Sequence, residues 1–223
     1  MIRSLPNILT VLRLLAAPAI ALVFFMLPHP YSDWAALILF VGASATDWLD
    51  GRLARSWNQV SMFGAMLDPI ADKAMVLIAL MVVVGLTGMP FAVTAPATII
   101  LFREVFVSGL REFLGDTAGL LKVTRLAKWK TTVQMVAISV LLAQGIPAHE
   151  FGARSFGMDN TMIGAVLGGA EPDAVGLRFF WQAALYFYWA GVALLWLAAA
   201  LTFATGWDYF RKARPFLQDE DGK

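Results

Sequence analysis

Cysteine is absent from the 223 residues, and charged side chains make up only 15% of the chain. Without cysteine the protein can form no disulfide, no thiolate nucleophile and no cysteine-bound metal site. The composition is 59% hydrophobic and the mean hydropathy is +0.69, more apolar surface than a soluble domain of this length can hide. The scarcity of charge therefore predicts a protein that lies within a membrane.

Long uncharged runs give six predicted membrane helices. A helix needs about 20 apolar residues to cross the hydrocarbon core. The uncharged run 74–102 is too long for one helix and is interrupted by Gly85, Gly88 and Pro90, so it predicts a hairpin of two helices. The predicted fold class is an all-α integral membrane protein, with one domain over residues 1–223. Its spans are expected at about 7–27, 33–55, 69–87, 90–113, 126–146 and 179–207.

The segments outside these spans carry fewer signals. The first span is expected to be retained rather than cleaved as a signal peptide, because Arg13 lies inside it and no small-residue cleavage site follows. Residues 147–178 form a predicted long outer loop, whose apolar stretch 161–170 is too short to span the bilayer. The polar tail from 208 onward is expected to be poorly ordered at its end.

Lys and Arg are distributed unequally between the two sides of this arrangement. Of the 17 basic residues, only Arg154 and Arg178 fall on one side. The positive-inside rule therefore places the other side, with both termini, in the cytoplasm.

Four aspartates at fixed spacing lie near the inner ends of the second and third predicted spans. The stretch reads Asp47-x2-Asp50-Gly51-x2-Ala54-Arg55-x8-Gly64-x3-Asp68-x3-Asp72. Residues three and four apart share a helix face, so each helix would carry two carboxylates on one stripe. Four carboxylates that face one another would form an oxygen cage suited to Mg2+ or Mn2+ rather than zinc. Gly51 and Ala54 would leave a shallow groove for a ligand, with Arg55 as a phosphate partner.

Simpler interpretations account for parts of this pattern. Asp68 followed by Pro69 is typical of a helix N-cap, and Asp50 with Arg55 could be an ordinary ion pair. Neither interpretation explains four acids next to long apolar segments. An acid at the bilayer centre costs about 2.5–3.5 kcal/mol, which is why acids in membrane helices indicate function.

The complete motif resembles the signature of the CDP-alcohol phosphotransferases, integral membrane enzymes that join a CDP-activated group to an alcohol. The resemblance implies two ions of Mg2+ or Mn2+ held by the four aspartates Asp47, Asp50, Asp68 and Asp72. It also implies that Asp72 serves as general base. The residues it implies for CDP binding are Asn7, Thr10, Gly51, Ala54, Arg55 and Gly64.

Asn7 and Thr10 have a second interpretation. They lie one helical turn apart and could hydrogen-bond the cytosine or its ribose. Capping of the first helix explains the same residue types.

A basic cluster lies at the inner ends of the fourth and fifth predicted spans. Its members are Arg103, Arg111, Lys122, Arg125, Lys128 and Lys130. The positive-inside bias and attraction to anionic lipid explain several of them. They explain Arg103 less well, because residues 100–102 and 105–107 around it are apolar. Its candidate partners are Glu104, the aspartate cage and an anionic substrate.

Three further segments, 5–13, 103–112 and 128–132, resemble the bacterial branch of the family whose acceptor is glycerol 3-phosphate. The resemblance covers most of residues 5–145. It implies transfer of the phosphatidyl group of CDP-diacylglycerol to glycerol 3-phosphate, with release of CMP. The acceptor phosphate would lie against Arg103, Arg111, Lys128 and Lys130, since fixed cations suit a phosphorylated acceptor.

The same resemblance implies an enzyme of the bacterial inner membrane that faces the cytoplasm, surrounded by membrane lipids. A homodimer is expected, and no nucleic-acid partner. Other acceptors stay open: phosphatidylglycerol, which would give cardiolipin, inositol phosphate, or serine, which the basic cluster disfavours. A cation transporter is a distant alternative, because transporters place acids near the midplane of repeated halves and this chain shows no repeat.

Overall fold

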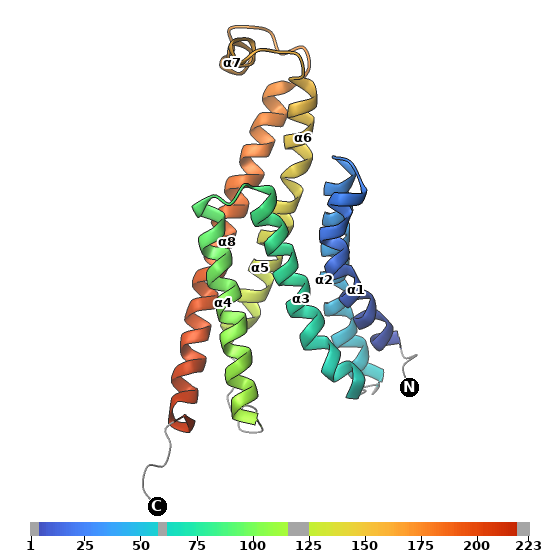
Figure 1. Cartoon of the computed structure of the whole chain (residues 1–223), viewed down its shortest axis with the longest axis vertical. Coiled ribbons are helices and arrows are strands. Elements are labelled where there is room, and N and C mark those ends of the chain that lie inside the picture. Colours follow the sequence, from blue (N-terminus) through green and yellow to red (C-terminus); the bar gives the residue numbers. More distant parts are fainter. Residues whose placement is uncertain (1–4, 58–61, 116–124, 218–223) are drawn as a thin grey trace, which may run out of the picture. The chain divides into compact units, whose positions relative to one another are not determined.

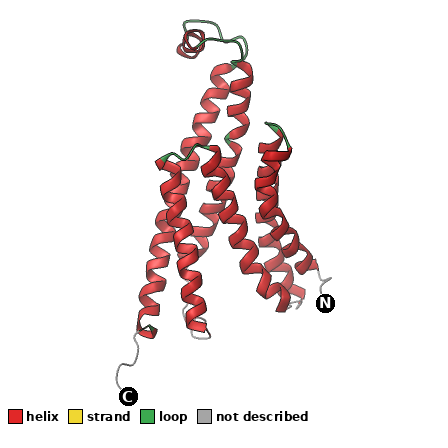
Figure 2. Ribbon diagram, viewed as in Figure 1, coloured by secondary structure: helices red, strands yellow, loops and turns green. Residues whose placement is uncertain are grey.

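The computed structural model describes residues 5–57, 62–115 and 125–217. Every regular element among these residues is helical, as Figures 1 and 2 show. The elements are α1 (Leu5–Met26), α2 (Tyr31–Trp57), α3 (Met62–Leu86), α4 (Phe91–Leu114), α5 (Arg125–Ala143), α6 (Gly145–Arg154), α7 (Asn160–Gly168), α8 (Leu177–Ala213) and a short 3-10 helix, Arg214–Phe216.

Five helical segments of the described chain are long and apolar enough to cross a membrane. They are Asn7–Met26, Met62–Leu86, Phe91–Leu114, Trp129–Arg154 and Leu177–Phe216. The predicted all-helical membrane class is therefore confirmed. The second predicted span corresponds to α2, a helix of 27 residues that carries Asp47 and Asp50 of the motif and is not among the five. The count of six spans and the side of the termini stay predictions.

The chain divides into two compact units. The first comprises Met1–Val83 and Ile138–Gly191, and the second comprises Val84–Ala137 and Val192–Lys223. The divisions fall inside α3, α5 and α8, so three helices contribute to both units. The single-domain interpretation stays a prediction.

Small residues allow close helix contacts in the first unit, where α1 packs along α2 (Figure 1). The start of α6 lies against the first turn of α2: a Cβ on Gly145 would come within 2.2 Å of the Asp33 carboxylate. A Cβ on Gly191 of α8 would meet the Leu141 side chain of α5 at 2.6 Å. Glycine at these two positions lets the backbones approach.

In the second unit, α4 and α8 run side by side in the same direction. The indole nitrogen of Trp196 donates to the carbonyl of Ala92 at 2.9 Å, near the start of α4. Further along, Tyr209 and Ala213 of α8 are buried against Val107 and Leu110 of α4. The helix α4 ends where Gly115 adopts a positive φ of 51°, a conformation that favours glycine.

The prediction of a loop over 147–178 was wrong in part. The helix continues through α6 to Arg154, and α7 occupies residues 160–168. Asp159 caps α7 by accepting a hydrogen bond from the amide of Met162 at 2.7 Å, and Gly169 ends it with a φ of 86°. A nine-residue helix has too few turns for a clear apolar periodicity. The sequence signs of α7 are its capping residues Asp159 and Gly169, which the prediction did not use.

Two arginines hold this outer segment together. Arg154 donates to the carbonyl of Val175 at 2.8 Å. Arg178 donates to the carbonyls of Val166 at 2.6 Å and Glu171 at 2.9 Å. They are the two basic residues that the charge count places outside, and both act in local structure.

Candidate functional site

The first half of the aspartate motif lies on α2. Asp47, Asp50, Gly51, Ala54 and Arg55 all belong to this helix, as their spacing predicts. Their side chains lie outside the described part of the structure. The cage they would complete, and the interpretation of Asp50 with Arg55 as an ion pair, stay predictions.

The second half of the motif lies on α3, which begins at Met62. Asp68 and Pro69 are therefore inside the helix, and the N-cap interpretation of Asp68 is wrong. Gly64, Asp68 and Asp72 follow one face at steps of four residues. Gly64 is buried, Asp68 is exposed, and the side chain of Asp72 is 44% exposed. Both carboxylates are thus accessible to a ligand.

Thr10 of α1 contacts the first of these carboxylates. Its hydroxyl donates to Oδ1 of Asp68 at 2.6 Å. Asn7 and Thr10 are both buried and lie within α1 rather than before it. Helix capping is therefore wrong as their explanation, while contact with the nucleotide stays a prediction.

Arg13, one turn beyond Thr10, holds the second carboxylate. Its Nη1 donates to Oδ1 of Asp72 at 2.6 Å, and its own side chain is 1% exposed. From the sequence alone, Arg13 is a cytoplasmic charge, evidence against a cleaved signal peptide and part of segment 5–13, but it has no assigned partner. A buried arginine in an apolar helix requires a partner, and that rule could have indicated that Arg13 has one. The partner itself lies 59 residues away and leaves no local trace in the sequence.

Together, α1 and α3 form a hydrogen-bonded pair of polar stripes in the first unit. Every third residue of the α1 stripe, from Asn7 through Thr10 to Arg13, is buried. Each contact engages one oxygen of its aspartate, and a carboxylate has about four acceptor positions. Thr10 and Arg13 therefore fix the orientation of the two carboxylates.

The donor set on the motif consists of oxygen atoms alone, which suits Mg2+ or Mn2+. Asp68 and Asp72 are open to solvent or ligand, as such ions require. Among the side chains that the structure describes, no three acids or histidines are placed to hold a metal. Two of the four predicted ligands, Asp47 and Asp50, are not among those side chains.

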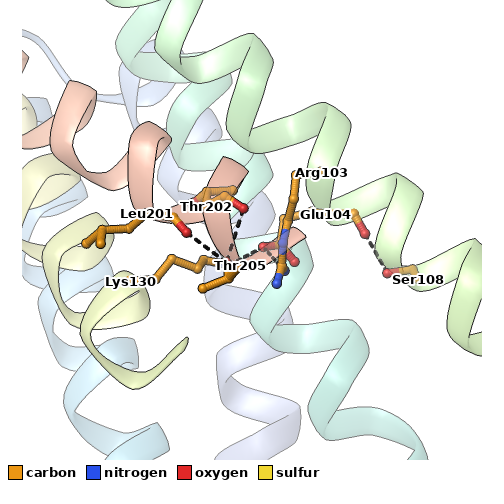
Figure 3. A network of polar contacts seen from close by, with 7 residues as sticks. All are labelled: Arg103, Glu104, Ser108, Lys130, Leu201, Thr202 and Thr205. Atoms are coloured by element: carbon orange, nitrogen blue, oxygen red, sulfur yellow. Dashed lines mark hydrogen bonds and ion pairs between the residues drawn. The ribbon is translucent and has the colours of Figure 1, made fainter. Parts of the chain in front are cut away.

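A second polar cluster lies in the second unit, between α4 and α5 (Figure 3). Nη1 of Arg103 donates to Oε1 of Glu104 at 3.1 Å. The ammonium of Lys130 makes an ion pair with the same oxygen. The three side chains are at most 15% exposed. The structure thus brings together two of the predicted acceptor residues, and Glu104 is the partner of Arg103.

Among the described side chains, this cluster contains two cations and one carboxylate, which leaves one positive charge in excess. An uncompensated charge is costly in an apolar region and favours an anionic ligand. Several buried polar atoms of the second unit also have no hydrogen-bond partner within the described residues. These buried atoms are Nε of Arg103, Oε1 of Gln134, Oγ1 of Thr202 and the hydroxyl of Tyr209. Gln134, four residues after Lys130 on one helix face, is the one that spacing could have indicated.

The other two predicted acceptor residues differ. The guanidinium of Arg111 lies over the ring of Tyr209, 5.3 Å from its centre. Arg111 is exposed and lies two helical turns from Arg103 on the same face of α4. Lys128 lies on α5, but its side chain is outside the described part.

Comparison with known proteins identifies the chain. The family model described as CDP-alcohol phosphatidyltransferase matches residues 3–204. The chain belongs to this family. The region that matches the CDP-alcohol phosphatidyltransferase family contains every site residue that the sequence predicts.

Individual family members are similar over nearly their whole length. A protein of Cereibacter sphaeroides named CDP-diacylglycerol--glycerol-3-phosphate 3-phosphatidyltransferase is 56% identical over 217 residues, which cover 97% of this chain and 98% of the relative. A protein of Escherichia coli K12 with the same name is 35% identical over 219 residues, with the same coverage. A third, from Shigella sonnei, is also 35% identical.

Proposed function

We propose that this CDP-alcohol phosphatidyltransferase transfers the phosphatidyl group of CDP-diacylglycerol to sn-glycerol 3-phosphate. The products are phosphatidylglycerophosphate and CMP. The observation that carries the proposal is the 56% identity, over 97% of the chain, to a protein named for this reaction. Family membership also argues against the cation transporter.

The reaction forms one phosphorus–oxygen bond and breaks another. The 1-hydroxyl of glycerol 3-phosphate attacks the phosphorus that carries diacylglycerol, the hydroxyl proton passes to Asp72, and CMP leaves with the bonding electron pair. Arg13 orients the carboxylate of Asp72 through its bond to Oδ1. Thr10 does the same for Asp68.

The residues Asp47, Asp50, Asp68 and Asp72 would hold Mg2+ or Mn2+, as their oxygen donors suggest. Bound ions would neutralise charge on the pyrophosphate and on the leaving CMP. On the nucleotide, Asn7 and Thr10 would contact the cytidine, with Gly51, Ala54, Arg55 and Gly64 along its groove.

The acceptor phosphate would bind at Arg103 and Lys130. Their excess positive charge over Glu104 supports an anionic acceptor. Arg111 and Lys128 would extend this site along the inner ends of α4 and α5. An acceptor without phosphate, such as serine, would leave that charge uncompensated.

The proposed location is the bacterial inner membrane, with the site and both termini facing the cytoplasm. The charge distribution of the sequence supports this orientation, and the soluble substrates occur in that compartment. A homodimer is proposed on family resemblance alone.

An acceptor panel tests the proposal. Purified protein receives CDP-diacylglycerol and one acceptor at a time, and CMP release is measured. We expect release with glycerol 3-phosphate and little with phosphatidylglycerol, inositol phosphate or serine. Release with phosphatidylglycerol alone would instead identify a cardiolipin-forming enzyme.

A further inference from the structure

A groove of about 460 Å³ lies between α4 and α8, within the second unit. Five aromatic side chains form most of its walls, and its exposed lining is apolar. They are Phe102, Phe106, Phe203, Trp207 and Phe210. Phe102, Phe203 and Trp207 are each more than 60% exposed. Because both helices belong to predicted spans, the medium outside the groove is lipid.

The polar end of Arg103 does not enter this lining. Its aliphatic stem lies on Gly206, where a Cβ would come within 2.8 Å of Arg103 Cγ. The guanidinium is directed to Glu104. The floor of the groove is therefore hydrocarbon and suits an acyl chain.

Positive charge follows at the inner end of the same helix face. Arg211 lies one turn after Trp207 on α8, and Arg214 begins the 3-10 helix that directly follows α8, four residues after Phe210. Both arginines are exposed. One acid on this part of α8, Asp208, is paired with Lys212 at 2.6 Å and lies 3.9 Å from Arg211. This surface thus runs from apolar to cationic. Its apolar part matches the acyl chains of a phospholipid, and its cationic part matches an anionic head group.

We propose that this groove binds a resident anionic phospholipid, with an acyl chain between α4 and α8 and the phosphate at Arg211 and Arg214. A second copy of the chain is the competing occupant. Membrane helices associate through small residues that let backbones approach. The rim of this groove consists of large aromatic rings that hold a neighbouring helix away, which favours a flexible chain. The lining includes the stem of Arg103, whose guanidinium belongs to the proposed acceptor site, but no residue of the aspartate motif.

Native mass spectrometry of the detergent-purified protein tests the site, with phosphatidylglycerol as the probe and phosphatidylcholine of the same chains for comparison. We expect the wild type to retain one phosphatidylglycerol in preference to phosphatidylcholine. The variant Thr98→Phe fills the groove and should bind at least tenfold more weakly. Its matched control is Leu101→Phe, one turn along α4, which is 46% exposed and does not line the groove. This control should bind as the wild type does.

Further arms separate the alternatives. Phe203→Ala removes a wall without adding bulk and should also weaken retention, even if Thr98→Phe folds poorly. Excess CDP-diacylglycerol should not displace the probe, and displacement would overturn the proposal in favour of a substrate-lipid site. Equal retention by Thr98→Phe, Phe203→Ala and wild type would overturn it as well. A loss of dimer mass in both variants with unchanged lipid would assign the groove to a second copy.

Discussion

Arg13 and Asp72 show how a membrane helix can carry a charge at little cost. The guanidinium is buried, while the carboxylate it holds is 44% exposed. The arginine is therefore compensated inside the protein, and the acid keeps an open side for a reacting group. In this arrangement Arg13 is a positioning residue for the proposed base.

Replacing Arg13 with Gln should lower turnover with little change in substrate affinity. A hydrogen bond to a charged group contributes about 1.5–3 kcal/mol, or roughly ten- to a hundredfold in rate if it is needed in the transition state. The measurement is kcat for CMP release, with each KM determined separately. Arg13→Lys keeps the charge and should recover part of the loss. A kcat within twofold of wild type in Arg13→Gln would contradict the positioning role.

Asp68→Asn should abolish most metal-dependent turnover and leave thermal stability nearly unchanged. The amide oxygen can still accept the hydrogen bond from Thr10, but the charged metal ligand is lost. CMP release at low Mg2+ and the unfolding temperature are measured on the same sample. Wild-type rates at low Mg2+ would remove Asp68 from the ligand set.

The sequence predicted the carboxylates of the site, but not the side chains that donate hydrogen bonds to them. Asp68 and Asp72 follow a fixed spacing on one helix, so a local pattern finds them. The hydroxyl of Thr10 and the guanidinium of Arg13 reach them from 58 and 59 residues away. Contacts of that range depend on how α1 and α3 pack, which no local period specifies.

At the scale of elements, a partly buried carboxylate caps the start of α8. Asp173 accepts hydrogen bonds from the amides of Leu177 at 2.7 Å and Arg178 at 2.9 Å, at the start of α8. The bond from the Arg178 amide is the main cause that holds the pKa of Asp173 below its usual range. Since the folded form has the lower pKa, this carboxylate stabilises the fold at neutral pH, and the effect is lost as pH falls through that value.

Asp173→Asn should therefore speed amide hydrogen exchange at Leu177 and Arg178 at neutral pH. The difference from wild type should shrink at strongly acidic pH, where the wild-type carboxyl is also protonated. Exchange is followed by mass spectrometry and corrected for the intrinsic rate at each pH. A difference that persisted unchanged into strong acid would assign the effect to side-chain shape rather than to charge.

Gly206→Ala should raise the KM for glycerol 3-phosphate and leave the KM for CDP-diacylglycerol unchanged. The new Cβ would sit 2.8 Å from Arg103 Cγ, so the arginine must move from its place beside Glu104. Gly109→Ala on α4 is the matched control, because its Cβ would meet nothing within 4 Å. Both changes favour the helix by about 1 kcal/mol. Equal kinetics in the two variants would separate Arg103 from the acceptor.

The long helices were predictable because apolar runs of sufficient length have few alternatives in a membrane. The predicted span 90–113 and the observed α4, Phe91–Leu114, differ by one residue at each end. The span predicted to begin at 69 begins at Met62 instead, because Pro69 suggested a start while the helix tolerates it inside. The outer helix α7 was missed because its caps rather than its apolar residues define it.

At the scale of the whole molecule, the proposed transfer requires a divalent cation, since four carboxylates would repel a pyrophosphate. EDTA should abolish CMP release, and added Mg2+ should restore it. Thermal unfolding of the EDTA-treated protein serves as the control for loss of fold. Full turnover in metal-free buffer would exclude the metal-binding role of the aspartates.

Gly206 also has an evolutionary consequence. Because Gly206 has no side chain, the stem of Arg103 can pack directly on it. Positions 206 and 103 should therefore vary together across the family. Lineages that keep a phosphorylated acceptor should retain the glycine–arginine pair. Lineages whose acceptor carries no phosphate need neither residue. In those lineages a larger residue at position 206 should occur together with loss of the arginine at position 103.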